Sequence, residues 1–136
     1  MKFSSQSIQN YLKKQRLGRL ASISPKGLPH IVAVAYVNDD SNLYFSTFTK
    51  TKKVKNIQTN KNVAFIVDDS GGDAGWRYVT LEGNGYLITD SEEFSNVREL
   101  LCDKYPVYLS DEWRIKEETH ILIRIEPRKI LTANIE

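Results

Sequence analysis

The sequence predicts a mainly β fold with two or three flanking helices: six or seven strands in an antiparallel sheet that curls into a barrel. Runs of β-branched, aromatic or alternating residues recur along the chain, and tight turns rich in Pro, Gly, Asn and Asp separate several of them. Such short connections favour antiparallel pairing, because parallel strands need long crossovers. The length of 136 residues suits one domain that spans residues 1–136.

Composition narrows the class of protein. Hydrophobic residues make up 40% of the chain and charged residues 26%, as in ordinary globular proteins. A formal charge of +2 is too small to predict nucleic acid or a membrane as the main partner. No segment approaches the roughly 18 apolar residues of a membrane span or resembles a signal peptide, so we expect a cytoplasmic protein. The single cysteine, Cys102, excludes an internal disulfide, and we expect it to be a buried thiol in a helix.

In the first half of the chain, a helix is predicted around residues 8–12, where apolar side chains have helical spacing. Ser4 or Ser5 is placed to cap it, and Gly18 is placed to end it. The further elements predicted in this half are strands over 19–24, 31–37 (buried), 43–47 and 63–67, turns over 25–27 and 38–42, a short helix over 51–59 with Val54 and Ile57 inward, and a loop over 68–75.

In the second half, residues 76–89 alternate over an unusual length for one strand. Gly83 and Gly85 interrupt it, which indicates a bulge or sharp bend. The elements predicted after it are a helix capped by Asp90 or Ser91 with Glu93 in a capping box, its core face formed by Phe94, Val97, Leu100 and Leu101, and two strands, 121–125 and 130–132, split by 126–128.

Hydroxyl and ammonium side chains alternate over residues 46–56, where a strand gives way to a helix. The free N–H groups and the dipole at a helix start favour an anion such as a phosphate. Thr49 or Thr51 can cap this helix or donate to a phosphate oxygen, and Lys52 and Lys53 bring positive charge to its first turn. Without a ligand these cations oppose the helix dipole, so the pattern indicates either a phosphate site or a solvated lysine face.

Several segments, in this order and spacing, resemble the pyridoxamine 5′-phosphate oxidase-like flavin-binding family. The resemblance covers about residues 8–90 and lies in five pieces: Gly18–Ser24, Lys26–Val32, Leu43–Thr47, Lys52–Ile57 and Tyr78–Gly85. It implies a split β-barrel of the FMN-binding type, which is a homodimer with FMN in a groove between the subunits. The implied function is an oxidoreductase that acts on a small molecule through the flavin.

The resemblance also implies which positions contact the cofactor. Ser46 and Thr47 match positions beside the flavin, Lys52 and Lys53 match the basic pair on the phosphate, and Tyr78 matches a polar position near the ring. The strand that would run along the ring and ribityl chain contributes His30, Ile31, Val32, Ala33, Val34 and Ala35. No catalytic residue is predicted, because the flavin carries the electron transfer itself.

Other readings of the sequence stay open. Trp113 and Arg114 do not match the substrate-binding C-terminal motif of authentic pyridoxamine phosphate oxidases, so the short, functionally diverse branch of the family is the better match. A deazaflavin coenzyme is the alternative cofactor, since Lys50, Lys55 and Lys61 supply further positive charge. Haem is less favoured because His30 and His120 lie in strand-like contexts, and no metal site is predicted. A flavin-binding protein without turnover and a nucleic-acid-binding barrel are the remaining functional alternatives.

Overall fold

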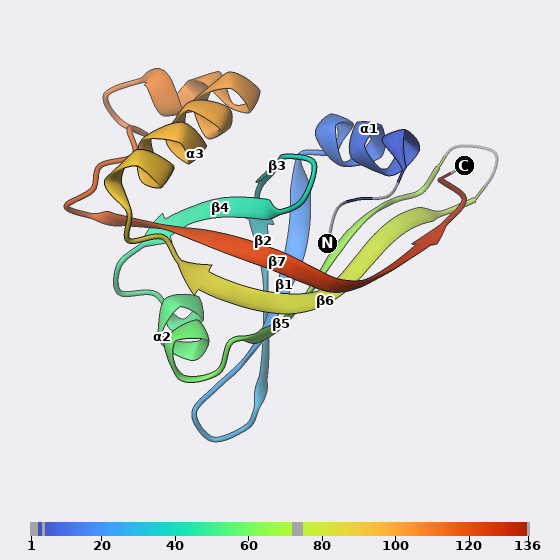
Figure 1. The fold of residues 1–136 in the computed structure, drawn as a ribbon, viewed down its shortest axis with the longest axis horizontal. Helices are drawn as coiled ribbons and strands as arrows, with labels where there is room; N and C mark the ends of the chain where they lie inside the picture. Colours follow the sequence, from blue (N-terminus) through green and yellow to red (C-terminus); the bar gives the residue numbers. More distant parts are fainter. Residues whose placement is uncertain (1–2, 4, 72–74, 136) are drawn as a thin grey trace.

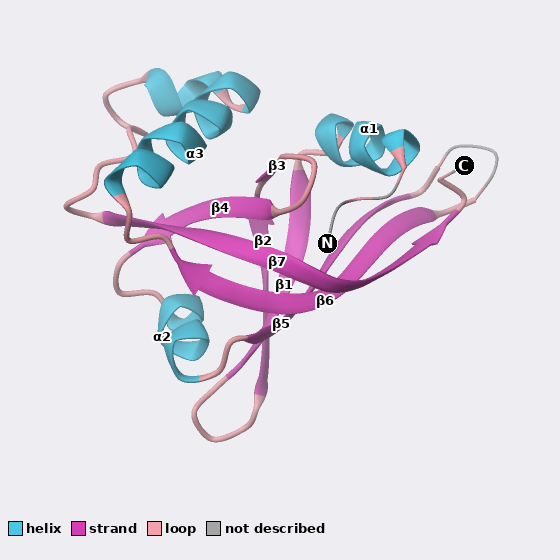
Figure 2. Cartoon of the chain, in the orientation of Figure 1, coloured by secondary structure: helices cyan, strands magenta, loops and turns pink. Residues whose placement is uncertain are grey.

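A computed structural model describes residues 3, 5–71 and 75–135 of the chain. A seven-stranded antiparallel sheet forms its centre, with strand order β2-β1-β5-β6-β7-β4-β3 (Figure 1). Strands β1 and β2 run steeply across the direction of β4, β6 and β7, so the sheet is strongly curled, as the sequence predicts. Within the described residues, three α-helices lie around the sheet (Figure 2).

The bounds of the elements follow the chain order. They are α1 (Gln6–Lys14), β1 (Leu17–Ile23), β2 (Pro29–Ala35), β3 (Val37–Asn38), β4 (Leu43–Phe48), α2 (Lys52–Thr59), β5 (Asn62–Asp69), β6 (Arg77–Leu87), α3 (Ser91–Lys104), a 3₁₀ turn η2 (Pro106–Leu109) and β7 (His120–Ala133).

The start of helix α1 agrees with the prediction, but its end does not. The Ser5 hydroxyl accepts a hydrogen bond from the Ile8 N–H (3.2 Å), whereas Ser4 lies outside the described residues. The helix ends at Lys14 with Gln15 as its C-cap, not at Gly18. Gly18 belongs to β1, where a Cβ would lie 2.1 Å from the Phe65 ring. The absence of a side chain thus serves close packing between two strands rather than helix termination.

Strand β2 is not buried as predicted. It lies at the edge of the sheet and pairs with β1 alone among the described strands. Its side chains alternate between a partly buried and an exposed face, and Ile31 is 67% exposed. An unbroken apolar run therefore gives a strand with an uncovered apolar face.

Strand β7 is continuous where two strands were predicted. Pro127 faces Gly83 of β6, and the register between the strands shifts at this point, so that one extra residue, Arg128, is accommodated as a bulge. Proline is tolerated at such a bulge because a ladder hydrogen bond is already missing there. The bend predicted at Gly83 is confirmed, but it bends β7 rather than ending it.

The second half holds two further corrections. Asp68 and Asp69, predicted in a loop, are the last residues of β5, and residues 72–74 of that loop lie outside the described part. Helix α3 starts as predicted, with the Asp90 carboxylate accepting the Glu93 N–H (2.9 Å). The Glu93 side chain does not complete the capping box, because it accepts hydrogen bonds from Arg124 instead.

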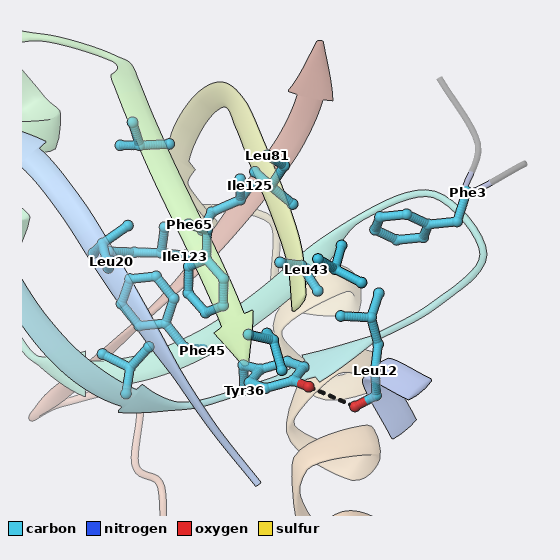
Figure 3. Close-up of a cluster of buried hydrophobic side chains, with 14 of the residues drawn as sticks. Phe3, Leu12, Leu20, Tyr36, Leu43, Phe45, Phe65, Leu81, Ile123 and Ile125 are labelled. Atoms are coloured by element: carbon cyan, nitrogen blue, oxygen red, sulfur yellow. Dashed lines mark hydrogen bonds between the residues drawn. The ribbon is translucent and has the colours of Figure 1, made fainter. Parts of the chain in front are cut away.

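Two clusters of buried side chains hold the elements together. The larger one joins α1, α2 and the inner face of the sheet; Tyr36 lies in it, and its hydroxyl donates to the Leu12 carbonyl (Figure 3). The smaller one lies between α3 and the other face of β4 and β7. Phe94, Val97 and Leu101 are buried there as predicted, whereas Leu100 is partly buried and Cys102 is also only partly buried. Together these clusters fix α2 and α3 at the same end of the sheet (Figure 1).

Candidate functional site

A groove of about 320 Å³ lies at the end of the sheet where α2 and η2 are found. Its walls come from three parts of the chain that are distant in sequence: the end of β2, the end of β4 with the start of α2, and the segment from η2 to the start of β7. The lining residues are Ala33, Val34, Ala35, Ser46, Thr47, Phe48, Thr51, Lys53, Tyr108, Glu112, Trp113 and His120.

The start of α2 gives the groove an anion-binding end. Thr51 occupies the N-cap position, but its side chain makes no capping hydrogen bond. Its hydroxyl is instead 3.1 Å from the Thr47 hydroxyl, with which it forms a hydrogen bond. The N–H of Lys55 bonds to the Thr51 carbonyl as the helix begins. The N–H groups of the first turn are therefore left for an outside acceptor, and the helix dipole favours a negative one.

Of the two predicted lysines, one faces the groove. Lys53 lines it and is half-buried, and burial lowers the pKa of its ammonium group. It makes no ion pair with an acidic side chain in the part of the chain that the structure describes. Lys52 is exposed and does not line the groove. A partly desolvated cation without a counter-ion is unfavourable by itself and becomes favourable when an anion binds.

Aromatic side chains give the groove an apolar surface in addition to its cationic group. Phe48 is 63% exposed and Trp113 is 56% exposed, although both are large and apolar. The Phe48 ring packs against the imidazole of His120, with ring centroids 4.7 Å apart. Exposed aromatic surface around a cavity indicates a site for a planar ring, because such surface is otherwise costly to leave in water.

The groove contains seven of the thirteen predicted cofactor positions and lacks six. Those that line it are Ala33, Val34, Ala35, Ser46, Thr47, Thr51 and Lys53. Those that do not are His30, Ile31, Val32, Thr49, Lys52 and Tyr78.

The two other predicted aromatic and imidazole positions have distinct surroundings. His30 pairs across the sheet with Ser22, and its Nδ1 is buried without a hydrogen-bond partner among the described residues. Tyr78 stacks on Trp76 near the start of β6, at the far end of the strand from α2 (Figure 1). Within one chain it cannot reach the groove.

Five lining residues were missed from the sequence: Phe48, Tyr108, Glu112, Trp113 and His120. Phe48 is the last residue of β4, and the other four come from the segment between α3 and β7 and the first residue of β7, which no predicted motif covers. Glu112 is an exposed acid on the same groove. The one available signal was the presence of Trp113 and His120 in a polar segment, where an aromatic residue has no obvious core to enter.

A match to a family model identifies the protein family of the chain. Residues 4–134 match the model described as pyridoxamine 5′-phosphate oxidase. The chain belongs to this family. A relative, the 5a,11a-dehydrotetracycline/5a,11a-dehydrooxytetracycline reductase of Streptomyces rimosus, is 28% identical over 142 residues, which cover 100% of this chain and 86% of the relative.

Solved structures confirm the fold of the family. A protein from Mesorhizobium loti described as FAD-binding has a TM-score of 0.76 at 24% identity, covering 97% of this chain and 95% of that one. A structure described as an F420 reductase has a TM-score of 0.67 at 24% identity, covering 90% and 94%. At this level of identity the likeness concerns the fold alone. No helix in the described ranges has both the length and the apolar character needed to cross a membrane.

Proposed function

We propose that this member of the pyridoxamine 5′-phosphate oxidase family binds FMN in the groove and acts as a reductase on a small molecule. The observation that carries the proposal is Lys53, a half-buried ammonium group beside the uncapped start of α2. Phosphate is the chemistry that satisfies both features at once, since it accepts hydrogen bonds from backbone N–H groups and neutralises the lysine.

The residues present fit a flavin phosphate. Lys53, the Thr51 hydroxyl and the first-turn N–H groups of α2 would hold the phosphate, and Thr47 fixes the Thr51 side chain through the hydroxyl contact of 3.1 Å. Phe48 and Trp113 offer apolar surface to a planar ring. The flavin supplies the hydride or electron transfer when bound, and the protein supplies binding, orientation and shielding from water.

The reductase assignment draws on the relatives. The Streptomyces rimosus relative is named as a reductase of a small polycyclic substrate, and a structure of the same fold is described as an F420 reductase. A deazaflavin coenzyme is therefore the second candidate. Lys50, exposed and next to the N-cap residue Thr51, is the spare cation that favours it.

We also propose that the groove is completed by a second copy of the chain. The outer face of β1, β2 and β5 carries Ala21, Ile31, Ala64 and Ile66 around a shallow hollow, and Ile31 is 67% exposed. Ala33 is exposed on the outer face of β2 and also lines the groove, so a partner on this face would reach the edge of the groove. Tyr78 and Thr80 are two residues apart in β6, so their side chains lie on the same face of the sheet. Because Tyr78 does not line the groove of its own chain, its predicted contact with the cofactor requires the partner subunit.

The test is to identify and then titrate the cofactor. The purified protein, or protein incubated with FMN, is expected to show flavin absorbance, and mass spectrometry of the released small molecule separates FMN from a deazaflavin coenzyme or haem. Fluorescence titration should then give a saturable affinity for FMN with quenching of the flavin. A protein that releases no such molecule, and binds neither FMN nor the deazaflavin coenzyme, would refute the proposal.

A further inference from the structure

We propose that a second cavity, which shares His120 with the groove, binds the substrate, and that the substrate is a small ring-containing molecule with a carbonyl or hydroxyl oxygen and no negative charge. In this proposal His120 is a substrate-binding residue that donates a hydrogen bond to that oxygen. The inference rests on the proposed function, because a cofactor in the neighbouring groove is what makes this cavity a substrate site.

The second cavity has a volume of about 260 Å³ and lies between the end of β6, the start of α3 and the start of β7. Ile88, Phe94 and Ile121 supply apolar surface, and Asp90, Glu117 and His120 supply polar groups. An apolar cavity of about 150 Å³ is enough for benzene, so this volume suits a substituted ring. The mixture of an apolar lining with a few polar groups is typical of small-molecule sites.

The hydrogen bonds of His120 determine which of its nitrogens carries the proton. The backbone N–H of Lys116 donates to its Nδ1 (3.2 Å), and the Thr119 hydroxyl is 2.8 Å from the same atom. A backbone N–H only donates, so Nδ1 is an acceptor and the neutral ring carries its hydrogen on Nε2. Nε2 forms no hydrogen bond with any residue that the structure describes, so its N–H is available to a ligand.

The orientation of the imidazole is fixed before a ligand arrives. Its ring packs on Phe48 at a centroid distance of 4.7 Å, and the Nδ1 contacts hold one edge. The ring lines both the groove and the second cavity. A donor with a set direction at the boundary of two cavities is suited to hold one molecule against the other.

The charged residues that line the two cavities favour different ligands. Asp90 and Glu117 face the second cavity, and no lysine or arginine of the described residues lines it, whereas the groove has Lys53 at the start of α2 in addition to Glu112. The phosphate of a cofactor is therefore favoured in the groove and opposed in the second cavity. An anionic substrate is opposed there for the same reason, which leaves a neutral or cationic molecule.

The experiment is calorimetric titration with two probes that share a phenyl ring: acetophenone, which has a neutral carbonyl acceptor, and benzoate, which is an anion. Each is titrated into protein without FMN and into protein saturated with FMN. We expect acetophenone to bind in both states and benzoate to bind at least several-fold more weakly. His120→Phe keeps a ring against Phe48 but removes the donor, and should weaken acetophenone binding two- to about tenfold. His120→Gln restores an N–H donor and should recover most of this loss.

The charge argument has its own variant and matched control. Glu117→Gln should strengthen benzoate binding about two- to fivefold relative to acetophenone binding. Glu99→Gln removes an exposed carboxylate from α3 that lines neither cavity, and should change neither affinity.

Three results would overturn the inference: no binding of acetophenone to the unaltered protein, competition between acetophenone and FMN, or an unchanged affinity in His120→Phe. Failure of the proposed function gives a different pattern. Protein that binds acetophenone in a His120-dependent way, but has no affinity for FMN or the deazaflavin coenzyme, would support the cavity assignment and refute the cofactor.

Discussion

Replacing Lys53 by Met removes the ammonium group from the groove and keeps the length of the apolar stem. The structure makes Lys53 the lysine that reaches the phosphate, since it is half-buried and lines the groove, whereas Lys52 is exposed beside it. A charge-assisted hydrogen bond to a partly buried anion contributes about 1.5–3 kcal/mol, so Lys53→Met should weaken FMN binding about 10- to 150-fold. Lys52→Met is the matched control, with an expected loss of at most about fivefold.

The assay is a fluorescence titration with two ligands, FMN and riboflavin. Riboflavin has the same ring and ribityl chain without the phosphate, so its affinity should be equal, within about twofold, in the unaltered protein and in Lys53→Met. The stability of the cofactor-free protein gives an independent readout. Because burial lowers the pKa of Lys53, its ammonium group is partly desolvated without compensation, and the Met variant should be at least as resistant to urea.

Two outcomes would refute this reasoning. Equal losses for FMN and riboflavin would show that Lys53 contacts the ring region or supports the fold rather than the phosphate. A larger loss in Lys52→Met than in Lys53→Met would show that the exposed lysine, not the half-buried one, holds the anion.

Three further predictions concern stability and assembly. Gly18→Ala should lower the free energy of unfolding by about 1–3 kcal/mol in urea titrations, because the new methyl group would lie 2.1 Å from the Phe65 ring. Gly27→Ala tests backbone strain separately, since the new Cβ would have no neighbour within 4 Å among the described residues but φ is +81°. An unchanged free energy of unfolding in Gly18→Ala would refute the packing argument. Burial lowers the pKa of Lys104 to about 8, so between about pH 8 and 9.5 the unfolded chain binds more protons than the folded protein. The free energy of unfolding should therefore rise by about 1 kcal/mol over this range, after allowance for partial exposure. Lys104→Met should abolish the rise, and a rise that persists in this variant would assign it to another group. Ile31→Asp should raise the dissociation constant of the dimer, measured by light scattering, at least about tenfold. Leu28 is 61% exposed in the neighbouring turn, and Leu28→Asp should leave this constant unchanged. Equal effects of the two substitutions would mean that the outer face of β2 is not the interface.

The sequence predicted the strands well where alternation was local. The long strand predicted over residues 76–89 and the bulge or bend at Gly83 follow from residue patterns within a single segment, and the structure has both: β6 spans Arg77–Leu87, and its register against β7 shifts at Gly83. The continuous β7 was not predictable in this way, because a proline inside a strand normally argues against it. The tolerance of Pro127 depends on the register shift in β6, which is a property of two strands paired across some forty residues of chain.

The candidate site was predictable to the extent that one segment carries it. Residues 46–53 contain the hydroxyls and lysines in consecutive order, so their chemistry was visible in the sequence. The distinction between Lys52 and Lys53 was not visible, since it depends on how α2 is rotated against the sheet. Trp113 and His120 reach the groove from a segment more than 60 residues later in the chain, and only the pairing of β4 with β7 brings Phe48 opposite His120.

The place of β7 in the sheet has a consequence for how the protein is assembled. Among the described strands, β7 is the last in sequence and stands between β6 and β4, with residues 120–125 paired to β4. The strand that carries Ser46 and Thr47 therefore lacks its β7 neighbour until residues 120–125 have been synthesised. Since such distant pairings form slowly, a newly made chain should acquire the capacity to bind a cofactor only after β7 has paired with β4.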